Sequence, residues 1–342
     1  MTLRRIRKIR RVNTAWLPTV GSMNSLQLTT PTLVDAGRIC ALIRRSEAFD
    51  HLPRVYSTEE LIEELSDPHI DLTRDVRLAR RDGDLVGWVR IGINPSGSRL
   101  ERADVFGHVD PVHRGTGVGR VLMTWATEVA TVRLQAMNNN LAKYIRTYTY
   151  TQCRDAQQLM SRLGYVQVRW FDDLLMSLDI RPAVAVPSGM SITAWPKDRG
   201  DEILAVKNIS FRDHWGSTPT SAQQWHAHVD GYGSRLDLSF VAIDQTTAEI
   251  VGMCHNTHYP DDEAVVQRRE GWIATLGTLR DHRGRGIASA LIAHSLEAFA
   301  GAGFTHALIG VDSDNPTGAS RLYRSLGFQP DQQQVAAQIQ VA

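Results

Sequence analysis

Residues 278–291 read Thr278-Leu-Arg-Asp-His-Arg283-Gly-Arg-Gly286-Ile-Ala288-Ser-Ala-Leu291. The same pattern stands earlier in the chain as Val109-Asp-Pro-Val-His-Arg114-Gly-Thr-Gly117-Val-Gly119-Arg-Val-Leu122. In both places a strand-like run leads into an Arg and a Gly-rich turn, and an apolar run with helical spacing follows. Such internal similarity indicates a repeated structural unit.

Two further matches flank the Gly-rich turns in the same order. Upstream, residues 85–88 resemble residues 250–253, and downstream, residues 159–165 resemble residues 322–328. The preserved order predicts a duplicated domain. Pro and Gly cluster between the copies, as is typical of a linker. We therefore expect a basic extension over residues 1–22, a first domain over 23–182, a linker over 183–189 and a second domain over 190–342.

Each copy has the pattern of a mixed α/β domain. Asp82-Gly83-Asp84 predicts a hairpin turn between two strands, and Ser57-Thr-Glu-Glu60 predicts a helix start. The tail from Asp331 is expected to supply the last strand of the second sheet. Strands are predicted at residues 26–29, 76–81, 85–93, 103–109 and 143–149, and again at 238–243, 250–257, 272–278 and 305–311. A helix is predicted after each Gly-rich turn, to about residue 131 in the first copy and over 289–300 in the second, and a later helix is predicted to end near residue 163 and near residue 326.

The Gly-rich turn is the main chemical signal. Gly284 and Gly286 allow the backbone to approach a ligand closely. The first N–H groups of a helix lie at the positive end of its dipole and suit a pyrophosphate. A turn that only connects a strand to a helix is the alternative. Other phosphate loops fit badly, because no Gly-Lys-Ser/Thr is present.

Together with residues further along the second copy, this turn resembles the GNAT family of N-acetyltransferases. The resemblance rests on Arg283–Ala288, on Asn315 and Ala319, and on the Leu322-Tyr323 and Leu326-Gly327-Phe328 stretches. The duplicated form, from residue 24 onward, is similar to the mycothiol synthases and related tandem acetyltransferases. It implies two α/β domains, each with a mixed, splayed six- to seven-stranded sheet flanked by helices. It also implies acetyl-CoA as co-substrate.

The resemblance implies a role for several backbone groups. The strand residues Leu276 to Thr278 would pair with the pantetheine amides, and Arg283 to Ala288 would surround the pyrophosphate. Asn315 would hydrogen-bond near the pantetheine. The cofactor-binding residues implied in the second copy are Leu276, Gly277, Thr278, Arg283, Gly284, Arg285, Gly286, Ile287, Ala288 and Asn315, and those in the first copy are Val109, Arg114, Gly115, Gly117 and Gly119.

Amine acetylation needs a proton donor for the departing thiolate, and a Tyr phenol can supply it. The resemblance puts Tyr323 beside the thioester sulfur. Several groups are candidates for the general base. The family's Glu has no counterpart within residues 271–278, so Glu270 is the nearest substitute. His255 and His258 are alternatives because His titrates near neutral pH, and a chain of water molecules is another.

The two copies differ at the candidate catalytic positions. Tyr323 stands four residues before Gly327, whereas Met160 stands four before Gly164. Gln152 is the counterpart of Asn315. We therefore expect chemistry in the second copy, with the first copy structural or limited to binding acyl-CoA.

The acceptor site is expected near Phe211–Gly216, after the first helix of the second copy. Asp213 is a candidate for binding an ammonium group and Trp215 for packing a ring, the alternative being an aromatic anchor at a helix end. His255 with His258, and His226 with His228, show no readable third ligand, and zinc needs at least three. No metal is expected.

Charge and cysteine content narrow the class of protein. The 342 residues include 38 basic and 37 acidic ones, for a net charge of +1. Residues 1–12 carry six basic residues and no acid, whereas the chain from Met23 onward is mildly acidic. Met23 is an alternative start of translation, because the first copy begins just after it. The acidic balance of the chain from Met23 onward predicts no nucleic-acid binding. The three cysteines lack a disulfide or zinc spacing.

No apolar run is long enough for a membrane span, and no secretory signal is visible. A cytoplasmic, monomeric enzyme is expected, because two fused copies bury within one chain what single domains bury by dimerising. The predicted function is acetyl-CoA-dependent N-acetylation of the primary amine of a small molecule. The alternatives are a non-catalytic acyl-CoA sensor and a protein or peptide N-acetyltransferase.

Overall fold

A computed structural model describes residues 26–93, 95–315 and 318–342, so the expected basic extension lies outside the described residues. The first half contains β1 (Gln27–Thr29), α1 (Ala36–Phe49), α2 (Thr58–Leu65), α3 (Leu72–Asp75), β2 (Val76–Arg81), β3 (Asp84–Ile93), β4 (Leu100–Val109), α4 (Val118–Gln135), β5 (Ala142–Tyr150), α5 (Arg154–Arg162) and β6 (Val166–Ser177). The second half contains β7 (Met190–Ala194), α6 (Gly200–Ser210), α7 (Ala222–Asp230), β8 (Phe240–Asp244), β9 (Ile250–Thr257), α8 (Glu263–Val266), β10 (Glu270–Thr278), α9 (Ile287–Gly301), β11 (His306–Asp312), α10 (Ala319–Ser325) and β12 (Gln329–Val341).

Local sequence signals account for several of these boundaries. The Ser57 hydroxyl accepts a hydrogen bond from the N–H of Glu60 at 2.9 Å and so caps α2. Asp82 and Gly83 adopt φ values of 54° and 88° between β2 and β3, as a two-residue hairpin turn requires. Both predicted signals are confirmed.

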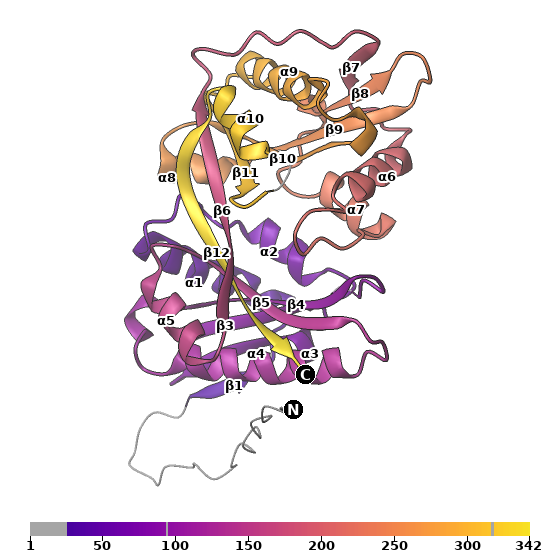
Figure 1. Ribbon diagram of the computed structural model, residues 1–342. Helices are drawn as coiled ribbons and strands as arrows, with labels where there is room; N and C mark the ends of the chain where they lie inside the picture. The colour runs from indigo at the N-terminus through magenta and orange to yellow at the C-terminus, as the bar shows by residue number, and fades with distance from the viewer. Residues whose placement is uncertain (1–25, 94, 316–317) are drawn as a thin grey trace, which may run out of the picture.

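The strands of the two halves join in one sheet through an exchange of their last strands. The strand order among the described residues is β1-β2-β3-β4-β5-β12-β6-β11-β10-β9-β8-β7. β6, from the first half, pairs with β11 of the second, and β12 pairs with both β5 and β6. In Figure 1, β6 and β12 run side by side between the halves. The α/β class is confirmed, but the expectation that the tail would remain in the second half's sheet is wrong.

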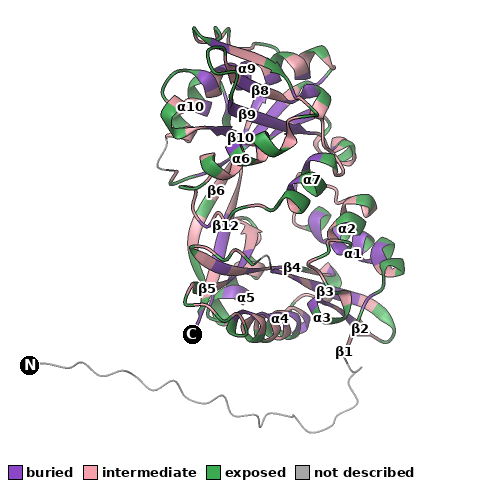
Figure 2. Cartoon of the chain, turned by 90° about the vertical axis from the view of Figure 1, so that its right-hand side faces the viewer, coloured by how far each residue is buried: buried purple, intermediate pink, exposed green. Residues whose placement is uncertain are grey.

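Helices cover both faces of this sheet, and the apolar cores lie between helix and sheet. On one face, Leu122 and Leu134 of α4 pack with Ile145, and Leu291 and Phe299 of α9 belong to the corresponding core of the second half. Helices α1 and α6 cover the opposite face of their own halves. Figure 2 shows α1, α2, α6 and α7 on the same side of the β6–β12 pair.

In each half, two parallel strands diverge before the Gly-rich turn. β4 and β5 pair as far as Val105 and Thr147, and β10 and β11 pair as far as Ile273 and Ile309. β4 and β10 then continue for several residues with no strand on that side in the described structure. In β10 the register against β9 also shifts just after Ile273, a shift that the β3–β4 pair lacks. The splay implied by the resemblance is therefore present.

We expect a charge placed on the exchanged strand β12 to destabilise the first half. Ala337 is buried with Ile145 and Tyr165 of that half. Ala337→Asp would bury an uncompensated carboxylate, and it should lower the unfolding free energy by about 3 kcal/mol or more. Gln340→Asp, at an exposed position of the same strand, should have little effect. Denaturant unfolding combined with amide hydrogen exchange checks this. Loss of amide protection confined to the second half would contradict the placement of β12 in the first half's core.

Candidate active site

The Gly-rich turn has the same backbone form in both copies. Gly284 and Gly286 have φ values of 73° and 84°, and Gly115 and Gly117 have values of 75° and 90°. These are left-handed conformations that glycine adopts without steric cost. Gly286 and Gly117 directly precede α9 and α4, and no side chain caps either helix start.

The turns leave a row of backbone donors available. The N–H groups of residues 284–289 and 115–120 donate to no acceptor in the described part of the chain. Consecutive unpaired N–H groups at the start of a long helix match the needs of a pyrophosphate. The residues present therefore fit the phosphate end of a CoA molecule in both copies.

An Arg anchors each turn to the rest of its half. Arg283 donates from Nε to the Thr278 carbonyl at 3.2 Å and from Nη2 to the Ser210 carbonyl at 2.8 Å. Arg114 makes a bidentate ion pair with Asp50 at 2.6 and 2.7 Å. In both copies the guanidinium therefore positions the turn, and the backbone remains as the ligand-facing group.

Tyr323 lies within the second half's core. It is 7% exposed on α10 and belongs to the same buried cluster as Ile287, the first residue of α9, while Leu276 packs against that cluster. No described group hydrogen-bonds to the Tyr323 hydroxyl, and burial raises its pKa above the usual range. The phenol therefore keeps its proton at neutral pH. Asn315 precedes α10, and its N–H donates to the Asp312 carbonyl at 3.0 Å.

Glu270 lies at the start of β10, at the end opposite the Gly-rich turn. Its side chain is buried and pairs with the Arg268 guanidinium. Burial raises the pKa of Glu270, and Arg268 opposes that shift. The structure therefore gives this carboxylate a partner of its own and does not bring it to the turn.

His255 lies within a closed aromatic cluster. Its ring is fully buried at 5.7 Å from Trp195 and 5.0 Å from His228, between ring centroids. Nε2 is 2.9 Å from the Ser234 hydroxyl, and Nδ1 has no partner among the described residues. Burial, aided by His228, lowers the pKa of His255 to about 3. His258, the other alternative, pairs with Glu263 at 2.8 Å.

The two candidate acceptor residues each have partners of their own. Asp213 pairs with Arg280 at 2.5 Å, and this hydrogen bond lowers its pKa. Trp215 packs its ring against the guanidinium of Arg146, 3.8 Å from the ring centroid. Asp213 therefore lies beside the Gly-rich turn, and Trp215 reaches across to strand β5 of the first half.

Sequence reasoning missed one carboxylate at the diverging strands. Asp173 on β6 pairs with Gly310 on β11 in the sheet. A Cβ built on Gly310 would meet the Asp173 Oδ1 at 3.5 Å and no other described atom within 4 Å. Burial raises the pKa of Asp173 to about 6. Two acidic residues inside a strand are the only sequence signal, and the strand exchange that brings Asp173 to Gly310 is invisible in the sequence.

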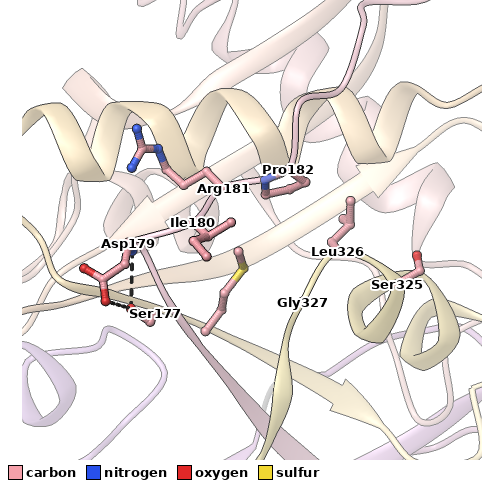
Figure 3. A pocket seen from close by; sticks show the side chains of 9 residues that line it. Ser177, Asp179, Ile180, Arg181, Pro182, Ser325, Leu326 and Gly327 are labelled. Carbon is pink, nitrogen blue, oxygen red and sulfur yellow. Dashed lines mark hydrogen bonds between the residues drawn. The ribbon is translucent and has the colours of Figure 1, made fainter.

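Two surface hollows lie away from the Gly-rich turn. The first, of about 490 Å³, is shown in Figure 3 and lies between the end of α10 and the segment after β6; it is lined by Met176, Ser177, Asp179, Ile180, Arg181, Pro182, Ser325, Leu326 and Gly327. The second, of about 620 Å³, lies between the segment after α1, the α8 region and β12. Neither includes a predicted site residue.

Within the described residues, no cluster of three His, Cys, Asp or Glu side chains is arranged to hold a metal ion. The same residues contain no helix with the length and apolar character of a membrane span.

We expect His255 to make stability depend on pH. Its folded pKa of about 3 lies below the ordinary 6.5, so only the unfolded chain takes up this proton as the pH falls from 7 to 5. The wild type should therefore lose about 2 kcal/mol more unfolding free energy over this range than His255→Gln. Denaturant titrations at both pH values measure the difference. Equal losses would show that the ring protonates in the folded state.

Comparisons with known proteins agree with this arrangement. A model of the acetyltransferase (GNAT) family matches residues 200–328, and a model of the acetyltransferase (GNAT) domain matches residues 73–167. A mycothiol acetyltransferase of Frankia alni is 28% identical over 290 residues, covering 75% of this chain and 82% of that protein. Another, of Tsukamurella paurometabola, is 24% identical over 312 residues, covering 89% and 96%.

Solved structures show the same fold. A GCN5-related N-acetyltransferase from Sphaerobacter thermophilus superposes with a TM-score of 0.72 at 24% identity, covering 92% of this chain and 96% of that one. A tandem GNAT protein from the clavulanic acid biosynthesis pathway gives a TM-score of 0.71 at 18% identity, covering 93% and 99%. With two matched domains, two Gly-rich turns and two splayed strand pairs, the chain belongs to the GNAT acetyltransferase family and carries that domain in tandem.

Proposed function

We propose that the protein transfers the acetyl group of acetyl-CoA to the primary amine of a small molecule, and that the second copy carries out the reaction. The observation that carries this proposal is the asymmetry between the copies. Both have the turn with unpaired N–H groups, but only the second adds a buried Tyr at the position that Met160 occupies in the first. The fold is the same in both copies and does not by itself favour either one as the site of the reaction.

When bound, acetyl-CoA supplies the thioester carbonyl that the amine attacks, so that a C–N bond forms and the C–S bond breaks. The N–H groups of residues 284–289 hold the pyrophosphate. The backbone of Leu276 to Thr278, which has no described strand on its β11 side, holds the pantetheine and offers a donor to the oxyanion. Tyr323 gives its proton to the departing thiolate.

The proton of the amine must pass to a general base, for which the chain offers several candidates. Glu270 remains a candidate because its raised pKa suits a base, although Arg268 already pairs with it. A His with a pKa of about 3, closed within an aromatic cluster, is a weak base at neutral pH, which argues against His255. Asp213 and Trp215 remain the candidates proposed for the acceptor loop.

The acceptor we propose is a small-molecule amine. Relatives named mycothiol acetyltransferase make a mycothiol-type cysteinyl amine the first class to test, followed by amino acids and amine-bearing antibiotics. We also propose a cytoplasmic monomer, since the strands that domains could exchange between two chains are exchanged here within one.

An amine panel tests this function. Purified protein is mixed with acetyl-CoA and each amine, free thiol release is followed, and products are identified by mass spectrometry. We expect stoichiometric thiol and N-acetyl product with at least one small amine. A protein that binds acetyl-CoA but acetylates none would favour the sensor, and acetylated peptides alone would favour a peptide acetyltransferase.

Tyr323→Phe should lower kcat about a hundredfold, because it removes the proton donor for the thiolate. Its KM for acetyl-CoA should stay close to the wild-type value. Tyr165→Phe is the control, since it deletes another buried hydroxyl, the one 2.8 Å from the Thr127 hydroxyl. Steady-state kinetics of both variants provide the measurement, and an unchanged kcat in Tyr323→Phe would remove the acid assignment.

A matched pair of Gly variants tests which copy holds the reacting cofactor. Gly286→Ala and Gly117→Ala impose similar left-handed strain, and an added Cβ meets neighbours only at 3.6 and 3.7 Å. Each should cost about 1 kcal/mol of stability. Only Gly286→Ala should raise the KM for acetyl-CoA, about tenfold, because Cβ crowds the phosphate-binding backbone. Equal effects in the two variants would assign turnover to both copies.

A further inference from the structure

The duplication places two pairs of residues in equivalent positions. In the parallel strand pairs, Thr147 is the last paired residue of β5 and Ile309 the last of β11, and each is followed by a residue on the face opposite the core. That residue is Tyr148 in the first half and Gly310 in the second. Across the neighbouring exchanged strand, Tyr148 pairs with Ala336, whereas Gly310 pairs with Asp173.

In the first half, the ring of Tyr148 fills this position. It stacks on the ring of Phe106 from β4, with the two centroids 6.1 Å apart and the planes 10° from parallel. The face of the sheet is therefore covered beside this diverging strand pair by a side chain of the protein itself.

In the second half, the same position is open and lies beside a carboxylate. Gly310 is exposed; it pairs with β6 on one side and lies just past the last β10–β11 pair on the other. Asp173 is only 8% exposed, and its carboxylate accepts one hydrogen bond, from Gln334 Nε2 at 3.4 Å. Within the described residues it forms no ion pair within 4 Å. Arg54, Asp172 and Asp331 act on it from further away, and Arg54 is itself paired with Glu60 at 3.1 Å.

A carboxylate that is nine-tenths buried and has no cationic partner is costly unless something pairs with it. The open volume beside Gly310 is where such a partner fits, because Gly310 adjoins Ile309, the last residue before β10 and β11 diverge. An amine bound there lies next to the diverging strands, where the pantetheine is proposed to bind.

We propose that Asp173 and Gly310 form the subsite for the cationic amine of the acceptor, whose ammonium group binds where the Tyr148 ring covers the sheet in the first half. The subsite rests on the proposed function and deepens it, since it names a protonated primary amine as the group recognised. Asp173 acts as a positioning residue. Because it comes from β6, the first half of the chain supplies part of the second half's active site.

The test uses the full chain and the best amine from the panel. Asp173→Asn should raise the KM for the amine about tenfold to a hundredfold, the loss expected for a hydrogen bond to a charged group. The KM for acetyl-CoA should change less than twofold. Asp172→Asn is the matched control: it removes the same charge one residue away, where Ser313 and Gln333 hold the carboxylate at 3.0 and 2.7 Å.

A second pair of variants tests the open volume itself. Gly310→Ala places its Cβ at ordinary contact distance from Asp173 and should change the KM for the amine less than threefold. Gly310→Arg places a cation of the protein beside Asp173 and should abolish amine binding while CoA binding stays unchanged. Binding of the amine to the CoA complex, followed by calorimetry, gives this readout without turnover.

The outcomes separate the two proposals. Acetyl transfer with an amine KM that is the same in wild type, Asp173→Asn and Gly310→Arg overturns the subsite and leaves the function standing. If the wild type binds an amine without acetylating it, the same variants are compared by calorimetry, and undiminished binding overturns the subsite. A wild type that neither acetylates nor binds any amine of the panel overturns both proposals.

Discussion

The hydrogen-bonded contact between β6 and β12 is the interaction on which the rest of the structure depends. Each strand leaves its own half, pairs with a strand of the other half, and pairs with its counterpart in between. The backbone ladder is therefore unbroken across the molecule. Buried residues of β12 complete the first core, and Leu174 and Met176 of β6 belong to the second core. Two domains that could have been linked only by a flexible connection are held in one register.

This register also determines what lines the space at each diverging strand pair. The residue opposite Gly310 is decided by which strand lies next to β11, and that strand comes from the other half. Ala336 and Asp173 occupy equivalent places in the two halves but differ in charge. The duplication thus keeps the same backbone in both copies. Two differences in side chain cover the sheet beside the diverging strands in the first copy and leave it exposed in the second.

The Gly-rich turns, where the phosphates of CoA are proposed to bind, are instead alike in the two copies. Gly117 and Gly286 share a left-handed backbone, and Arg114 and Arg283 each bind the end of the first long helix of their half, α1 or α6. A phosphate is recognised through backbone N–H groups, so its site survives changes in side chains. A proton donor is one particular side chain, and the replacement of Tyr by Met is enough to remove it.

The family, the class of fold, the Gly-rich turns and the hairpin at Asp82-Gly83 were all predictable from the sequence, since each depends on residues that lie close together along the chain. The same holds for the difference between Tyr323 and Met160. The surroundings of His255, Asp213 and Trp215, and the pairing of Asp173 with Gly310, were decided only by the tertiary structure. Each of these depends on neighbours from distant segments, and the exchange of β6 and β12 brings in neighbours from the other copy. A strand's sequence determines that it pairs and which face is apolar, whereas its partner depends on how the whole sheet closes.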